Sequence, residues 1–233
     1  MVGIAQDDAR EDRLIDMFNL LQSPGRARHG TDAILKLEDH EYEFELKSIT
    51  TKRGGISTVR DLGPDHIAKW RNKHWIMAYF EGQKLLHCRY GSPEAMRPWI
   101  EEKWNYIKAD FELAKHVPGH IALDTMYEIM GKKQVYTLAD AKKLHKNQMK
   151  AAEYRSAMDV EGGYSPNCML SIFRDRARYI IKRGSTLNNP HIPETFLNSW
   201  PTIKQDYASE LRRLVSEYRN SRPLRPTGLS GTP

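Results

Sequence analysis

The sequence contains few cysteines and no long hydrophobic run, and both absences limit what the protein can be. Cys88 and Cys168 are its two cysteines and lie far apart, so neither a disulfide framework nor a Cys-x-x-Cys metal site is expected. The longest unbroken apolar run, residues 75–80, is far shorter than the roughly 20 residues that a transmembrane helix needs. No charged-then-apolar leader opens the sequence. We therefore expect a cytoplasmic protein with no membrane partner.

Charge is present in both signs but is unevenly distributed along the chain. The 233 residues carry 36 Lys and Arg and 30 Asp and Glu, a net charge of +6. Residues 1–45 hold 11 acidic and 5 basic residues, whereas residues 46–233 hold 19 acidic and 31 basic ones. Such a division suggests carboxylates that hold a cation against the phosphates of a polyanion. The simpler alternative is that the basic residues only keep the protein soluble.

The apolar pattern predicts a small sheet followed by many helices. Apolar residues alternate with polar ones over residues 31–51, with one interruption at 38–41, which indicates two strands joined by a turn. Residues 74–80 and 84–90 predict a second strand pair, and we expect the sheet to be complete by residue 90. Helices are predicted at about 7–21, 65–70, 93–115, 121–130, 137–155, 168–183, 193–199 and 202–220.

The first strand pair has a face that carries charged side chains. With residues 38–41 as the turn, the apolar side chains fall on one face and the polar ones on the other. On the polar face Asp32 is predicted to lie opposite Lys47 and diagonal to Glu45, at the roughly 7–8 Å that diagonal neighbours span. Glu45 and Lys47 share this face because they are two residues apart on one strand. The pattern thus predicts two carboxylates and an amine facing solvent together.

Two carboxylates and an amine in this arrangement suit phosphodiester hydrolysis. Asp32 and Glu45 are able to share one Mg²⁺, which binds a few carboxylates and retains several waters. Lys47 would orient a water or stabilise the charge that develops on phosphorus. An ordinary Asp32–Lys47 ion pair on a solvated hairpin, in a DNA-binding module without catalytic activity, explains the spacing equally well. The basic loop at 52–55 and the basic remainder of the chain favour a nuclease.

These residues resemble the motif of the PD-(D/E)xK nuclease superfamily, and within it the type II restriction endonucleases. Asp32 matches the first acid of the motif, Glu45 the second and Lys47 the lysine, and Thr31 stands where the motif has proline. The resemblance covers residues 11–90. It implies an α/β, restriction-endonuclease-like core with a small mixed β-sheet flanked by helices, and a helix-rich C-terminal half.

The same resemblance implies a function and a set of ligands. The expected activity is Mg²⁺-dependent hydrolysis of double-stranded DNA at a short specific sequence, performed by a homodimer, with the metal held by Asp32, Glu45 and the backbone carbonyl of Leu46. Glu11 or Asp16 of the first helix is a possible additional acid. A repair or junction-resolving nuclease that recognises DNA structure would share this site and remains the alternative within the nuclease class.

We predict a single nuclease domain over residues 1–220. It comprises a catalytic core at about 11–90 and a helical part for DNA binding or dimerisation at about 93–220, and a disordered tail follows at 221–233. Basic residues that follow the catalytic strand are expected to contact DNA. They are Lys52, Arg53, Arg60, Lys69 and Arg71.

Overall fold

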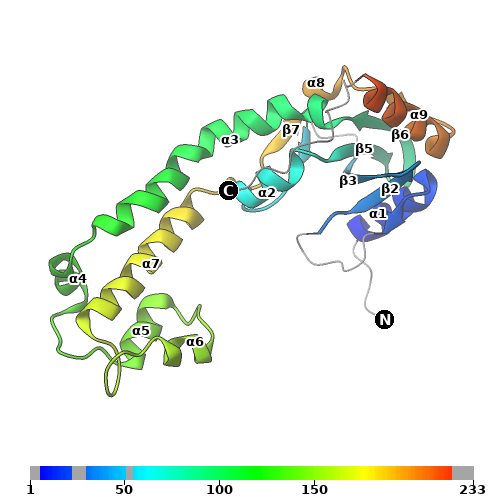
Figure 1. Cartoon of the computed structure of the whole chain (residues 1–233). Coiled ribbons are helices and arrows are strands. Elements are labelled where there is room, and N and C mark those ends of the chain that lie inside the picture. The colour runs from blue at the N-terminus through cyan, green and yellow to red at the C-terminus, as the bar shows by residue number, and fades with distance from the viewer. Residues whose placement is uncertain (1–5, 23–29, 51–54, 222–233) are drawn as a thin grey trace. The chain divides into compact units, whose positions relative to one another are not determined.

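The protein is described by a computed structural model that covers residues 6–22, 30–50 and 55–221. Backbone contacts divide the chain into two compact units (Figure 1). The sheet unit comprises the chain up to Glu102 and again from Asn188, and the helical unit is Lys103–Leu187. The predicted helical part at 93–220 is thus divided, because residues 188–220 return to the sheet unit. The single nuclease domain over residues 1–220 stays a prediction, and residues 222–233 lie outside the described chain.

The sheet unit is an α/β structure built on a mixed sheet, as predicted. Its main sheet has six strands in the order β1-β2-β3-β5-β6-β8, and β4 and β7 form a separate pair. The strands are β1 (Leu21–Gln22), β2 (Ala33–Leu37), β3 (His40–Thr50), β4 (Gly55–Ser57), β5 (His74–Glu81), β6 (Lys84–Gly91), β7 (His191–Pro193) and β8 (Thr202–Ile203). The helices are α1 (Gln6–Phe18), α2 (Pro64–Trp70), α3 (Pro93–His116), α8 (Glu194–Leu197) and α9 (Tyr207–Asn220).

The helical unit has its own core, separate from that of the sheet unit. It begins within α3, at Lys103, and also contains η1 (Val117–His120), α4 (Leu123–Met130), α5 (Leu138–His145), α6 (Ala151–Ser156) and α7 (Pro166–Gly184). Its buried cluster includes Met126 of α4, Tyr154 of α6 and Met169 of α7, none more than 1% exposed. Six of the nine buried residues of this cluster are methionine, tyrosine or phenylalanine, so these side chains supply most of this core.

The helix predicted at 137–155 is in fact two helices. α5 begins as expected, with a capping box between Thr137 and Asp140. It ends because Lys146 and Asn147 both have positive φ values, 54° and 56°, which a helix cannot continue through. The apolar period alone does not reveal this interruption, since the residues on either side keep a helical spacing.

The register of the β2–β3 hairpin differs by two residues from the prediction. Ala33 pairs with Phe44 and Leu35 with Tyr42, so the turn consists of residues 38 and 39 alone. Glu38 adopts a φ of 54°, which permits this tight turn where four turn residues were expected. A shift of two residues leaves every side chain on its predicted face. It brings Asp32, one residue before the paired segment, opposite Glu45 instead of Lys47.

The prediction that the sheet is complete by residue 90 is wrong. β8 adds to the main sheet by pairing Ile203 with Cys88 and Thr202 with Arg89, and β7 pairs with β4. The helices predicted at 193–199 and 202–220 accordingly start later, as α8 and α9. Strands of two or three residues are too short to show a period of two, so their sequences carry no detectable strand signal.

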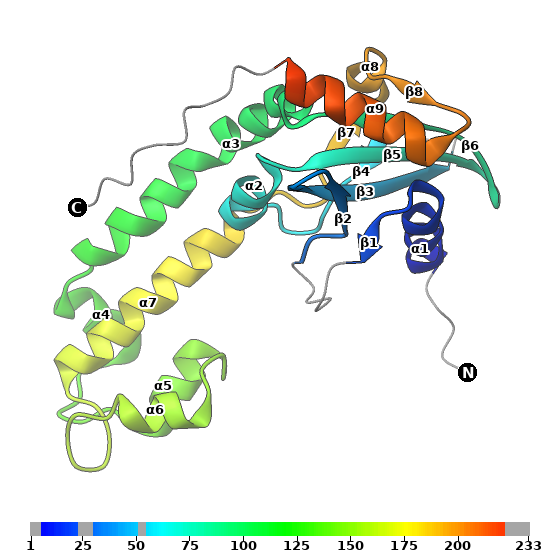
Figure 2. The ribbon, with the colours of Figure 1, turned by 45° about the vertical axis from the view of Figure 1, so that its right-hand side comes forward.

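The two faces of the main sheet are covered by different helices (Figure 2). β3 and β5 run parallel, with Leu46 opposite Ile76, and α2 lies in the connection between them. Leu46 and Ile76 belong to a core cluster with residues of α1 and α9, including Leu14 and Leu211. On the opposite face Trp75 packs against Trp70 of α2, with ring centroids 5.1 Å apart. Side chains of β3 that alternate with Leu46 therefore face α2.

Candidate active site

Asp32, Glu45 and Lys47 meet on the face of the sheet that α2 covers. The Lys47 ammonium is 2.8 Å from Oε1 of Glu45 and 3.8 Å from Oδ2 of Asp32, so it bridges the two carboxylates. The Leu46 backbone N–H donates to the same oxygen of Asp32 at 2.9 Å. This last bond ties the acid that precedes β2 to the middle of β3. The three residues singled out from the sequence are thus brought together.

Two further lysines reach Glu45 from the connection between β3 and β5. Lys73 Nζ lies 3.3 Å and Lys69 Nζ 3.7 Å from Oε2 of Glu45. Lys69 was predicted as a DNA contact, and this role stays a prediction; in the structure its ammonium lies near this carboxylate. Lys73 was not singled out from the sequence, because its contact with Glu45 depends on the pairing of β3 with β5. The apolar run at residues 75–80 marks a strand and gives no signal for its partner.

Burial and charge act in opposite directions on this cluster. Burial acts to raise the pKa of Glu45, but the charges of Lys47, Lys69 and Lys73 outweigh it and lower this pKa to about 2. Among the described residues Asp32 has a single lysine, Lys47, in salt-bridge distance, and here burial prevails and raises the pKa of the carboxyl. The pKa values of the two carboxyl groups therefore shift in opposite directions, because Glu45 has more ammonium groups around it than Asp32 has.

The lysines themselves respond in opposite ways. Burial acts to lower the pKa of Lys47, but the carboxylates of Glu45 and Asp32 outweigh it and raise the pKa above its ordinary value. Burial lowers the pKa of Lys73, which is fully buried, and Glu45 offsets this only in part. Lys47 is accordingly held as a cation between the two acids.

The face that carries these residues is only partly open to water, whereas a solvated face was predicted: the side chains of Asp32 and Lys47 are 20% and 19% exposed. Glu45 is only 3% exposed, although it is surrounded by ammonium groups and not by apolar side chains. The parallel pairing of β3 with β5 requires a crossover connection, and its helix, α2, lies over this face. A hairpin considered alone leaves the face solvated, which explains the error.

The oxygen atoms of Asp32 and Glu45 suit a hard divalent cation. The Lys47 ammonium already sits between them, which shows that the space between these carboxylates accepts a cation. Among the described residues no cluster of three or more His, Cys, Asp or Glu forms a metal site. A metal here would therefore depend on two carboxylates, a backbone carbonyl such as that of Leu46, and oxygens from water or substrate.

A cavity of about 610 Å³ opens beside Lys47 within the sheet unit. It extends from the middle of β3 to Ser57 and Thr58 and to His191 of β7. Glu11 of α1 also lines it and lies near enough to Lys47 to contribute to raising that lysine's pKa. Asp16, the other acid considered on this helix, is exposed and does not line the cavity. Of the two acids, the structure brings Glu11 to the site.

The remaining basic residues that were predicted to bind DNA form no ion pair with Glu45, as far as the structure describes them. Arg60 is exposed, and Arg71 is engaged through its Nε with Glu101 at 3.1 Å. Lys52 and Arg53 lie outside the described residues.

Comparison with known proteins finds a family model that matches the part of the chain that contains this site. The family described as restriction endonuclease PvuII matches residues 3–115. These residues include Asp32, Glu45, Lys47 and both additional lysines. No curated protein matches the chain. The family match ends before α4, so it does not account for most of the helical unit.

Proposed function

We propose that this chain, which matches the restriction endonuclease PvuII family of type II enzymes over residues 3–115, is a Mg²⁺-dependent endonuclease that cuts double-stranded DNA at a short specific sequence. The observation that carries this proposal is the convergence of Asp32, Glu45 and Lys47 beside a cavity. In the described residues no helix has the length and apolarity to cross a membrane.

The chemistry is attack of water on phosphorus, with cleavage of the bond to the 3′ oxygen and a 5′ phosphate left on the other product. Asp32 and Glu45, with the Leu46 carbonyl, would hold the cation, which when bound would polarise a phosphate oxygen and lower the pKa of a bound water. Lys47 orients the water or stabilises the charge that develops on the phosphate. The 3′ oxygen takes up a proton from solvent as it leaves.

The cluster around Glu45 supports this division of roles. Three lysines and two acids give it a formal charge of +1, which favours a phosphate next to it. Lys73 and Lys69 hold one oxygen of Glu45, whereas Lys47 contacts the other. Glu45 is therefore positioned before any substrate binds, as a metal ligand requires.

The resemblance to type II enzymes also supports a homodimer, in which each copy cuts one strand. Sedimentation of the full chain at micromolar concentration tests this, and a monomer both free and bound to duplex DNA would contradict it. A cytoplasmic location stays a prediction.

Digestion of a supercoiled plasmid of known sequence tests the proposed activity. We expect discrete fragments in Mg²⁺ and none with a chelator, and sequencing of the fragment ends gives the recognition site. Asp32→Asn and Glu45→Gln should each lower the cleavage rate by at least about 100-fold, since each removes a ligand charge. DNA affinity, measured in calcium, should survive both substitutions.

Glu41→Gln is the matched control, because Glu41 lies exposed on the same strand and, in the part of the chain that the structure describes, pairs only with the surface residue Lys36, at 3.0 Å. It should cut at the wild-type rate. Unchanged cutting by the Asp32 and Glu45 variants would refute the assigned site. Fragments of no fixed length would point to a structure-specific nuclease, and DNA binding without any cutting would point to a non-catalytic binding module.

A further inference from the structure

The helical unit carries all of the net positive charge of the protein. Residues 103–187 contain 15 Lys and Arg and 9 Asp and Glu, a net charge of +6, whereas the rest of the chain contains 21 of each. The family match ends at residue 115 and does not explain this excess. The proposed catalytic cluster, which needs positive charge next to a phosphate, lies in the other, neutral unit. The charge of the helical unit therefore calls for a separate explanation.

Three exposed lysines follow one another around the end of α5 and the start of α6. Lys143 lies in the last turn of α5, Lys146 ends this helix and Lys150 precedes α6. We call them the lysine surface. Of the described residues, none forms an ion pair with any of the three. Lys143 and Lys146 stand three residues apart at the end of α5, where like charges repel each other, so an external anion would relieve this repulsion.

The acids near the lysine surface are already engaged elsewhere. Both oxygens of Asp140 accept hydrogen bonds from Lys133, at 2.8 and 2.9 Å. Glu153 accepts a hydrogen bond from the backbone N–H of Lys150 at 2.7 Å, which caps α6 and leaves the ammonium group unpaired. Four other exposed lysines of the unit, at positions 108, 115, 132 and 133, do have partners close by. Lys115, for example, contacts Glu112 at 2.6 Å.

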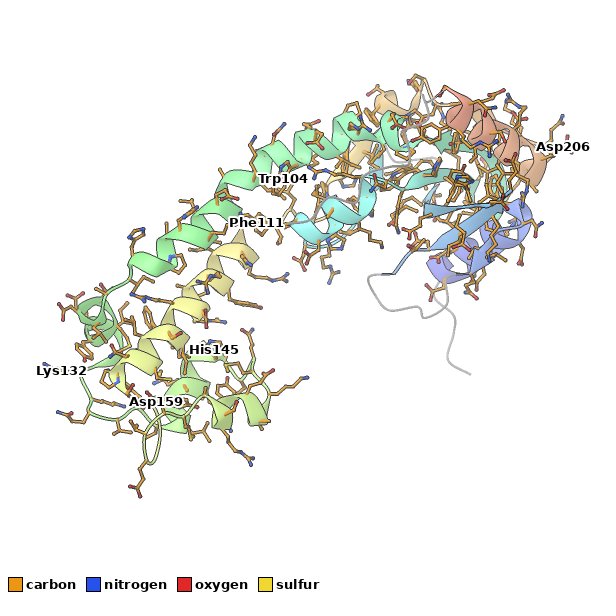
Figure 3. The ribbon with its side chains drawn as sticks, viewed as in Figure 1. Trp104, Phe111, Lys132, His145, Asp159 and Asp206 are labelled. Atoms are coloured by element: carbon orange, nitrogen blue, oxygen red, sulfur yellow. The ribbon has the colours of Figure 1, made fainter. Side chains whose placement is uncertain are left out.

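The segment that carries the lysine surface is held in place by α7 and by α6. Arg176 of α7 donates to Oε1 of Gln148 at 2.6 Å, and Gln148 donates to the hydroxyl of Tyr179 at 3.2 Å. The Arg176 guanidinium also lies over the Tyr179 ring, 5.1 Å from its centroid. His145, labelled in Figure 3, packs edge-on against Tyr154 of α6 at 6.4 Å. The lysines thus project from a fixed scaffold with a further cation, Arg176, beside it.

Both a DNA backbone and an anionic membrane attract lysines, and the apolar residues distinguish the two. A helix that lies in a membrane surface presents exposed large apolar side chains next to its lysines. Within residues 138–158, which carry the three lysines, no large hydrophobic side chain is exposed. The exposed Tyr179 and Ile180 belong to α7, a different helix. Phosphate contacts need only exposed cations on a rigid element.

We propose that the lysine surface of the helical unit, Lys143, Lys146 and Lys150, binds the phosphate backbone of duplex DNA as a second contact, separate from the cleavage site. This inference extends the proposed nuclease function. It does not depend on the DNA sequence, because phosphates carry no sequence information. It gives the enzyme additional affinity that falls steeply with salt.

The test compares two triple variants of the full chain that remove the same charge from the same unit. Lys143→Gln, Lys146→Gln and Lys150→Gln together remove the lysine surface. Lys108→Gln, Lys115→Gln and Lys132→Gln form the control, since these exposed lysines have local partners in Asn105, Glu112 and the Tyr127 ring. Thermal melting and circular dichroism verify that both variants fold.

Binding to a labelled duplex of about 40 base pairs is measured by anisotropy, with a chelator present, over a range of salt concentrations. Each phosphate contact contributes about 0.9 to the slope of log affinity against log salt, so the lysine-surface variant should lose about 2–3 from this slope, and the control variant none. The triple variant with arginine at positions 143, 146 and 150 should restore it.

Equal slopes for wild type and the lysine-surface variant, or equal losses in both triple variants, would overturn the proposal. So would loss of binding to phosphatidylserine vesicles with unchanged binding to DNA, because the surface would then serve a membrane. Plasmid cleavage separates the two proposals. Wild-type protein that binds with the expected salt slope but never cuts would contradict the nuclease function and leave the lysine surface supported.

Discussion

The sheet unit and the helical unit use charge in opposite ways. In the sheet unit, acidic and basic residues are equal in number, and five of them form a cluster in which Glu45 and Lys73 are buried. In the helical unit, the positive excess lies on exposed side chains such as Lys143 and Lys146. A buried cluster must balance desolvation against close pairing, whereas an exposed lysine keeps its hydration until an anion arrives. The sheet unit thus supplies the tightly paired cluster of the candidate active site, and the helical unit supplies the excess of exposed positive charge.

Met169→Ala tests whether the two units are separate in stability as well as in charge. Met169 is fully buried in the helical core, so its truncation should cost about 2–5 kcal/mol. Hydrogen exchange should show lost protection in α4 to α7 and unchanged protection in β3 and β5. Equal loss in both units would mean that they unfold together as one domain, which would break the comparison. Lys108→Gln, a surface change in the same unit, should leave both patterns unchanged.

Lys73→Met sharpens the role of the buried charges in the sheet unit. It removes the fully buried ammonium that holds Oε2 of Glu45, while Lys47 and Lys69 remain. We expect cleavage to fall by about 10–100-fold, as for other residues that orient metal ligands. The Mg²⁺ concentration for half-maximal cleavage should rise, which a merely structural role would not cause.

Lys84→Met provides the control for this change, because Lys84 is an exposed lysine of β6 in the same unit. It should leave both the rate and the Mg²⁺ dependence unchanged. If Lys73→Met lowers only the melting temperature, Lys73 supports the fold without positioning Glu45. Lys73→Arg, which retains the charge, should recover part of the lost activity.

The smallest expected effect concerns the two cysteines, one in each unit. Burial raises the pKa of Cys88 to about 12, so at pH 8 it stays a thiol and does not react. Cys168 is half-buried, and its pKa is also raised, mainly by burial and further by the charge of Asp159. It should therefore react slowly. Mass spectrometry after iodoacetamide treatment of native protein should find the label on Cys168 alone. Labelling of Cys88 at a similar rate would show that the sheet unit opens as readily as the helical unit.

Several elements of the fold could be predicted because their signals are local. The turn at Gly82 and Gln83 between two apolar runs gave the β5–β6 hairpin, and Pro64 marked the start of α2. Very short elements could not be predicted correctly, because too few residues carry their sequence signal. β7 and β8 are too short to show a period, and the turn at residues 38 and 39 was predicted two residues too long.

The candidate site was predictable only in part for the same reason. Asp32, Glu45 and Lys47 could be found because they lie on one hairpin, where a period of two fixes which side chains share a face. The register error did not matter, since a shift of two residues preserves the faces. Lys69 and Lys73 could not be found, because they reach Glu45 only through the pairing of β3 with β5.

The sequence by itself determined which side chains of the hairpin face the same way, the balance of charge between segments, and the chemistry that two acids and a lysine allow. Only the tertiary structure decided that α2 covers this face, that Glu45 is buried among three ammonium groups, and that residues from Asn188 onward return to the sheet unit. Side-chain periodicity is a local property of the backbone. Burial and long-range pairing instead depend on which distant segments pack together.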